Sequence, residues 1–253
     1  MRAAAWAGGS RRTLLWSALA LVGALAAVAV LRDEAPPAPD PTLGAVVRVG
    51  VAEGESIPDY LRDSRAELAA LSATGDTTGV ETYALVSFVA YLSPDRLASV
   101  LAEVPVAEVV ARVPLPGVQT EIVRIPAMRL PDDVVAGLMR VAERKEREAR
   151  DYRERAVAAE DARHRRLFQD NAGVAAGEAA AYRSSCACVY AAVVRAAPPV
   201  LARLAEAPEV RTVDPAPAVR RLDRTVLLPP LPEQEDVVRP PRDERLDDDR
   251  ADS

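Results

Sequence analysis

The stretch "LAEVP" (Leu101–Pro105) recurs 103 residues later as "LAEAP" (Leu204–Pro208), and this repetition decides the predicted fold. The same offset aligns "IVRIP" (Ile122–Pro126) with "TVLLP" (Thr225–Pro229). It also aligns three pairs of apolar residues: Val86 with Val189, Leu97 with Val200, and Val110 with Val213. Several matches in one register indicate that the chain contains a duplicated structural unit.

Each copy of the unit has the pattern of a strand, a helix and two further strands. In the first copy, the β-branched and aromatic run Glu81–Leu92 predicts a strand, and Ser93 followed by Pro94 is typical of a helix start. Two more strands surround the turn "PLPG" (Pro114–Gly117). The matching segments of the second copy are "CACVYAAVV", a helix that begins at Pro198-Pro199, "EVRTVD" and "RTVLL".

The fold class that follows is α+β, with a ferredoxin-like domain built from a duplicated βαββ unit. A further strand within Ala45–Gly54 and a helix over Asp59–Ala73 are expected in front of the first copy. We therefore place the first unit in residues 44–130, a helical region in 131–184 and the second unit in 185–238. Residues 239–253 are mostly charged residues and proline, a composition that predicts a disordered tail.

The N-terminus has the pattern of a membrane anchor. Three arginines within residues 1–12 precede an uncharged apolar run, Thr13–Leu31. Its nineteen residues would form a helix of roughly 28 Å, enough to cross the core of a bilayer. The arginines predict a cytoplasmic N-terminus and an extracytoplasmic domain, joined to the span by a proline-rich linker in residues 32–43. A cleaved signal peptide is the alternative, because "ALA" and "AVA" in the run have the small residues of a cleavage site, and "SRRTLL" resembles a twin-arginine signal.

Residues Asp132–Asp170 predict one long helix between the copies. The stretch lacks proline, contains a single glycine and begins with two acids at the positive end of the helix dipole. "DNAG" (Asp170–Gly173) is expected to break it before a second, alanine-rich helix. Beyond three amphipathic turns, a thin stripe of mostly small residues continues along the helix: Ala142, Ala149, Tyr152, Ala156 and Ala159. We expect this stripe to be an interaction surface for a partner helix or a second copy of the chain, as in a coiled coil.

Cys186 and Cys188 are the two cysteines of the chain. At the repeat offset they align with Tyr83 and Leu85, so the first interpretation is that both pack as small hydrophobic side chains in a strand. A Cys186–Cys188 disulfide is the second, because the domain is expected outside the reducing cytoplasm. A thiol-redox or metal site has less support, since the sequence has no Cys-x-x-Cys pair and only one histidine, His164.

Composition argues against catalysis and nucleic-acid binding. The net charge is −6, and the arginines are interleaved with Asp and Glu. The single histidine lies among arginines, so no Ser-His-Asp triad is expected. The acidic pairs Asp132/Asp133 and Glu233/Glu235 are interpreted as helix N-terminal charges, and the single lysine, Lys145, as a consequence of the Arg-rich composition. Without nucleotide, hydrolase or zinc-protease motifs, we predict a non-enzymatic protein with no cofactor, no metal and no small-molecule ligand.

One stretch resembles a known family of domains. "PPVLARLAEAPEVRTVDP" (Pro198–Pro215) is similar to the second half of subtilisin-type propeptide domains, with six residues at the matching places: Leu201, Leu204, Pro208, Val210, Val213 and Asp214. This resemblance implies a ferredoxin-like βαββαβ fold and an inhibitor or chaperone role toward a protease. The chain as a whole resembles single-pass membrane proteins of high-GC Gram-positive bacteria, a resemblance that implies a location and no activity.

Three hypotheses for the function follow. The first is a membrane-anchored, extracytoplasmic interaction or scaffold protein of the cell envelope, which associates with a protein partner or with itself through the long helix. The second is a propeptide-like inhibitor or chaperone of a secreted protease. The third is a membrane-anchored thiol-redox protein that uses Cys186 and Cys188.

Overall fold

The computed structural model describes residues 46–73 and 80–240, which belong to one compact unit. The predicted α+β class is confirmed, because these residues form five α-helices and two sheets. The strands are β1 (Val47–Gly50), β2 (Thr82–Leu92), β3 (Val106–Ala111), β4 (Val123–Pro126), β5 (Val189–Ala196), β6 (Val210–Ala216) and β7 (Thr225–Leu228). The helices are α2 (Ile57–Ala73), α3 (Pro94–Val100), α4 (Asp132–Ala158), α5 (Ala162–Arg183) and α6 (Pro198–Leu204).

The predicted N-terminal anchor, its linker and most of the charged tail lie outside the described residues. Among the helices that the structure describes, none combines the length and the apolar composition that crossing a bilayer requires.

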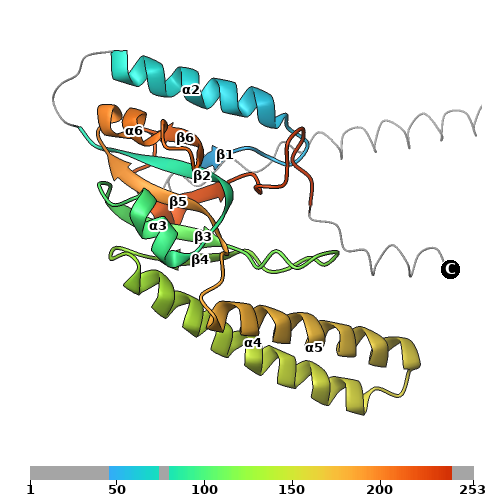
Figure 1. Ribbon diagram of the computed structural model, residues 1–253. Coiled ribbons are helices and arrows are strands. Elements are labelled where there is room, and N and C mark those ends of the chain that lie inside the picture. The colour runs from blue at the N-terminus through green and yellow to red at the C-terminus, as the bar shows by residue number, and fades with distance from the viewer. Residues whose placement is uncertain (1–45, 74–79, 241–253) are drawn as a thin grey trace, which may run out of the picture. The chain divides into compact units, whose positions relative to one another are not determined.

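The main sheet has five strands in the order β4-β3-β5-β2-β6, and every neighbouring pair is antiparallel (Figure 1). Helix α3 connects β2 to β3, which lie on either side of β5, and α6 connects β5 to β6, which lie on either side of β2. This interleaving joins the two predicted units, because each strand–helix–strand crossover leaves room for one strand of the other unit.

The larger core lies between the sheet and the helices. Side chains from alternate strand positions, such as Val86 and Val109, are buried with Leu97 of α3 and Leu201 of α6. Ser93 starts α3 as predicted, since its Oγ accepts a hydrogen bond from the N–H of Arg96 and Pro94 takes the first helical position.

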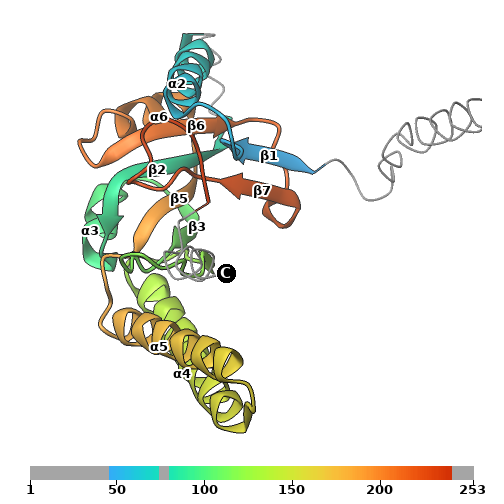
Figure 2. The ribbon, with the colours of Figure 1, turned by 90° about the vertical axis from the view of Figure 1, so that its right-hand side faces the viewer.

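The opposite face of the sheet is covered by the β1–β7 pair and by residues 229–240, which we call the C-terminal strap (Figure 2). Leu85, Tyr190 and Val193 of the sheet pack there with Val49 of β1 and Leu231 of the strap. The strap is also held through its backbone: the N–H of Val238 donates to the carbonyl of Glu55 (3.1 Å), and Arg211 donates to the carbonyls of Leu231 and Gln234.

The two predicted units differ at their last strand. In the first copy β4 pairs antiparallel with β3, whereas in the second copy β7 leaves the main sheet and pairs parallel with β1. At the β6 edge of the main sheet, α2 packs against the strand (Figure 1).

The single helix predicted over Asp132–Asp170 is wrong. The chain turns at residues 159–161 and returns as α5, so that α4 and α5 form an antiparallel hairpin (Figure 1). Asp161 caps α5 by accepting a hydrogen bond from the N–H of His164 (2.9 Å), and Arg165 donates to the carbonyl of Ala159 (2.8 Å). "DNAG", expected to break the helix, lies inside α5. A single glycine costs only about 1 kcal/mol inside a helix, and the packing of α5 on α4 can offset that cost.

Candidate functional site

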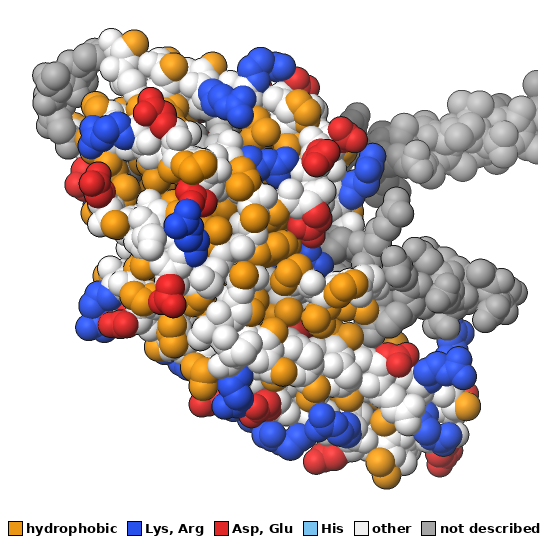
Figure 3. All heavy atoms as spheres, viewed as in Figure 1, with side chains coloured by type: hydrophobic (Ala, Val, Ile, Leu, Met, Phe, Trp, Pro, Cys, Tyr) orange, Lys and Arg blue, Asp and Glu red, His pale blue; other side chains and the backbone are white. Residues whose placement is uncertain are grey.

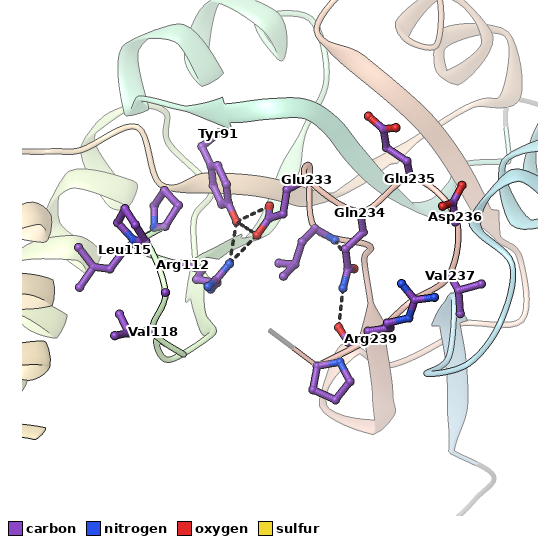
Figure 4. Close-up of a pocket in the computed structure, with 15 residues that line it drawn as sticks. Tyr91, Arg112, Leu115, Val118, Glu233, Gln234, Glu235, Asp236, Val237 and Arg239 are labelled. Carbon is purple, nitrogen blue, oxygen red and sulfur yellow. Dashed lines mark hydrogen bonds and ion pairs between the residues drawn. The ribbon is translucent and has the colours of Figure 1, made fainter. Parts of the chain in front are cut away.

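A cavity of about 630 Å³ lies between the loop that joins β3 to β4 and the C-terminal strap (Figure 4). Tyr91 at the end of β2 and Arg112 just after β3 form one wall. The loop adds an apolar rim, Pro114–Val118, and the strap adds Leu231 and the acidic stretch Glu233–Asp236. The site therefore combines residues that are more than 140 positions apart in the sequence.

Three side chains in this cavity point toward one another (Figure 4). The guanidinium of Arg112 donates to the Tyr91 hydroxyl (3.1 Å), to Oε1 of Glu233 (2.8 Å) and, through Nε, to Oγ1 of Thr120 (3.0 Å). The Tyr91 hydroxyl in turn donates to Oε2 of Glu233 (3.0 Å). The Glu233 carboxylate thus holds the strap over the sheet, because it accepts hydrogen bonds from both the Arg112 guanidinium and the Tyr91 hydroxyl.

Burial differs sharply between the two charges. The Arg112 side chain is 5% exposed and that of Glu233 is 51% exposed. A buried guanidinium needs a counter-charge, whereas an exposed carboxylate can be solvated by water. A carboxylate of a ligand could therefore replace Glu233 beside Arg112. Nη2 of Arg112 has no hydrogen-bond partner within the described residues.

Tyr91 is a hydrogen-bond donor here, since burial, together with the nearby charge of Glu233, raises its pKa to about 12. The hydroxyl therefore keeps its proton at neutral pH. A guanidinium, a protonated phenol and carboxylates in one cavity suit the recognition of a polar group rather than proton transfer.

A second polar cluster lies at the base of the helical hairpin and centres on Lys145. Its Nζ contacts three carboxylates: Glu178 (2.8 Å), Glu121 (2.9 Å) and Glu148 (3.1 Å). Burial would lower the pKa of Lys145, but the hydrogen bonds to Glu178 and Glu121 outweigh it, so the pKa is raised. Arg144 adds a two-pronged ion pair to Glu121 (2.8 and 3.0 Å). The cluster joins α4, α5 and the β3–β4 loop.

The single lysine thus has a structural reason that the sequence interpretation missed. An ammonium directs its donors to three separate carboxylates, which the planar fork of arginine matches less well. The available signal was its uniqueness in a chain that otherwise uses arginine. That signal was attributed to composition.

The predicted alanine stripe faces the chain's own α5. Ala142, Ala149 and Ala156 are buried, and they repeat every seven residues along α4. On α5 the matching small side chains are Ala172, Ala175 and Ala179, also buried. Tyr152 and Ala159 are half-buried, and the Tyr152 ring stacks on Phe168 of α5 with 6.4 Å between ring centroids. The helix that packs along this stripe is therefore part of the same chain.

Cys186 and Cys188 are joined by a disulfide, with their Cα atoms 5.3 Å apart. They lie in the turn between α5 and β5 rather than in the strand, so the interpretation of both as strand residues is wrong. Cys188 is buried in the larger core and Cys186 packs against that core. This placement suits a structural cross-link at the point where the hairpin rejoins the sheet.

The two acidic pairs have different roles. Asp133 is a helix N-terminal acid as predicted: its Oδ2 accepts from the N–H groups of Met128 (3.0 Å) and Arg129 (2.8 Å), which lower its pKa. Glu233 and Glu235 do not start a helix, because the strap is irregular there. Glu233 is a partner of Arg112 instead, and nothing local in the sequence marks that contact, which spans 121 residues.

Comparisons with protein-family models, with curated protein sequences and with solved structures give no match for this chain. The site is therefore interpreted from its own chemistry.

Proposed function

We propose that this protein is a membrane-anchored, extracytoplasmic interaction protein of the cell envelope, without catalytic activity. The observation that carries the proposal is the α4–α5 hairpin, whose outer half leaves the sheet and exposes apolar side chains at its end. Val157 is 88% exposed and Leu167 is 43% exposed. Figure 3 shows charged side chains of both signs along the hairpin.

The hairpin has the stiffness that a contact arm requires. The alanine seam lets α4 and α5 approach closely, the Lys145 cluster fixes the base, and the Tyr152–Phe168 stack lies near the outer end. Because these contacts already order the helices, a partner would not bear the entropy of ordering them on binding. In this proposal, the ordered arm presents Val157 and Leu167 to the partner.

The disulfide supports the extracytoplasmic part of the proposal. Disulfides persist in oxidising compartments and are rare in the bacterial cytosol. The N-terminal apolar run supplies the anchor in this proposal, with the chain beyond it on the outer side of the membrane.

The strand order supports a ferredoxin-like description of the domain. Strands β3-β5-β2-β6, with α3 and α6 on one face, have the βαββαβ connectivity, and β4, the hairpin and the β1–β7 pair are additions to it. The same order favours a protease inhibitor or chaperone as the second candidate. Inhibition of a subtilisin-type protease by the full chain would support that candidate.

The proposed function can be tested by substituting exposed residues at the hairpin end and measuring chemical cross-links in intact cells. We expect Val157→Ser with Leu167→Ser to abolish chemical cross-links between the full chain and its envelope partners, because the exposed apolar contact is lost. The matched control is Val80→Ser with Val89→Ser, which removes two exposed valines elsewhere on the domain (66% and 50% exposed) and should keep the cross-links. Unchanged cross-links in the hairpin variant, and in a chain with residues 153–168 replaced by Gly-Asn-Gly, would show that the hairpin is a spacer.

A further inference from the structure

A second concave surface, which we call the basic edge groove, lies between β4 and α4 and has a volume of about 300 Å³. Four arginines line it: Arg124 on β4, and Arg140, Arg144 and Arg147 on α4. The other lining residues are Ile125, Pro126, Gly137 and Val141, so its lining contains no carboxylate. In a protein with a net charge of −6, this is a local concentration of positive charge.

The arginines converge for two reasons. Residues 140, 144 and 147 have the spacing of one helix face. Gly137 then lets this face lie against the sheet edge, because a Cβ at that position would overlap Cγ2 of Ile125. The groove is therefore a product of the packing of α4 on β4, which the large core fixes through Val134 and Leu138.

Only part of this positive charge is neutralised within the chain. Arg144 pairs with Glu121, and Arg124 pairs with Glu108. Arg140 and Arg147 form no ion pair within the described part of the chain. Two exposed guanidinium groups are thus available, and their planar fork matches a carboxylate.

The strand side of the groove has free backbone groups. Strand β4 is the edge of the main sheet. The N–H of Ala127 donates to the carbonyl of Ala107 (3.1 Å), and the hydrogen bonds of an antiparallel ladder alternate along a strand. Ile125 therefore faces β3 with its backbone, whereas the N–H and C=O of Arg124 and the C=O of Pro126 face outward. These groups suit a short added strand, and Pro126, which lacks an N–H, limits its length.

We propose that the basic edge groove binds an extended, acidic segment of a partner polypeptide, which adds a short strand beside β4 while its carboxylates pair with Arg140 and Arg147. The two arginines are seven residues apart on α4, about 10 Å along the axis. An extended segment covers that length in three to four residues, with alternate side chains on the same side. The inference rests on the proposed interaction function and names the chemistry of the partner.

The test measures binding of a defined peptide to the full chain in non-ionic detergent. The probe is fluorescein-Gly-Gly-Val-Asp-Val-Glu-Val-Asp-Val, and the readout is fluorescence anisotropy. We expect Arg140→Ala with Arg147→Ala to weaken binding by about tenfold or more, since two charge-assisted contacts are lost. The matched control, Arg150→Ala with Arg153→Ala, removes the same charge from the same helix outside the groove and should change the affinity less than about twofold.

Two further measurements separate strand addition from simple charge attraction. A peptide N-methylated at alternate residues should lose affinity, because it cannot complete the ladder. Arg140→Glu with Arg147→Glu should instead bind the peptide in which Lys replaces Asp and Glu. All variants should keep the thermal midpoint of the parent protein, because both arginines are exposed and unpaired within the described residues.

The proposal is overturned if both double variants lose affinity equally, if N-methylation has no effect, or if inorganic polyphosphate or phosphatidylglycerol vesicles displace the peptide at equal charge concentration. Displacement by either phosphate probe would indicate that the groove binds phosphate groups rather than a peptide. Failure here leaves the proposed function standing as long as the cross-links of the hairpin end, which does not line the groove, still respond to Val157→Ser and Leu167→Ser.

Discussion

At the scale of single residues, Asp214 connects three parts of the fold. It lies on β6 with 8% of its surface exposed, and its Oδ2 accepts from the N–H of Gly50 (3.0 Å) and the hydroxyl of Tyr60 (3.1 Å). These contacts join β1 and α2 to the main sheet. Burial raises the pKa of Asp214 to about 6, although both hydrogen bonds favour the charged form.

This residue gives a pH dependence with a definite sign. Because the folded pKa exceeds the unfolded value of about 3.9, the stabilising contribution of Asp214 is complete below pH 4 and is lost as the pH rises through about 6. Asp214→Asn stays neutral and still offers an oxygen to Gly50 and Tyr60. We expect it to match the parent at pH 4 and to exceed it by on the order of 2 kcal/mol at pH 7.5 in urea unfolding.

Asp223→Asn is the control for this measurement, because Asp223 is exposed and pairs with Arg221 at the surface. Its effect should stay within about 0.5 kcal/mol at both pH values. A difference between the parent and Asp214→Asn that is the same at pH 4 and pH 7.5 would contradict the raised pKa.

At the scale of elements, the sequence predicts what local chemistry determines. The β-branched runs and the Ser93-Pro94 helix start correctly predict β2, α3, β3 and β4, and the corresponding signals of the second predicted unit correctly predict β5, α6, β6 and β7. Those signals are local side-chain preferences, which can be recognised from the sequence alone. The Arg112–Glu233 contact is not local, and for that reason the candidate cavity was not predicted.

The long helix shows the limit of the same method. A run without proline and with few glycines predicts helix, but the turn at residues 159–161 depends on two contacts that periodicity does not express: the Asp161 cap and the burial of α4 alanines against α5. The stripe has the spacing of a close-packing seam, and its buried alanines lie where α4 packs on α5. The sequence places the start of the second helix after Gly173, so it predicts that the stripe contacts another molecule.

Gly137 provides a prediction for the packing of these elements. Gly137→Ala gains helix propensity, but the new methyl group must displace the buried side chain of Ile125, so we expect a net loss of about 1–3 kcal/mol in the free energy of unfolding. Gly173→Ala on α5 is the matched control. It has open space around the new methyl group and should gain roughly 0.5–1 kcal/mol.

Urea unfolding of both variants checks the prediction. If Gly137→Ala is as stable as Gly173→Ala, then α4 does not need its close approach to β4, and the walls of the basic edge groove are less fixed than the geometry indicates.

At the scale of the whole molecule, the additions to the sheet lie where they protect it. Helix α2 packs on β6, and the β1–β7 pair with the strap covers the face that two crossover helices leave open. Strand β4 extends the other edge and ends at Pro126, a residue that limits further pairing. The charged α4–α5 hairpin leaves the domain at this same edge. The hairpin end and the basic edge groove, which are the two proposed contact regions, therefore both belong to the β4 side of the sheet.

The location of the molecule can be tested through the two cysteines. In the full chain expressed in a bacterial host, we expect Cys186 and Cys188 to be blocked to a maleimide-polyethylene glycol reagent after denaturation, and both to be labelled once the sample is reduced, because the proposed extracytoplasmic location would place the domain in an oxidising compartment. The same chain without residues 1–31 stays in the cytosol and should be labelled at both positions without reduction. The full chain should also stay with the membrane fraction after a carbonate wash.

A chain with Cys186→Ser and Cys188→Ser controls for unspecific labelling and should give no shift under any condition. Immediate labelling of the full chain would mean that its thiols are reduced, and the extracytoplasmic placement would then be wrong even if the membrane fraction still held the protein. Release by carbonate with the thiols blocked would instead indicate a cleaved signal, since export and anchoring are separate consequences of the same apolar run. The two readouts together therefore distinguish an outward-facing anchored domain from a secreted one and from a cytosolic one.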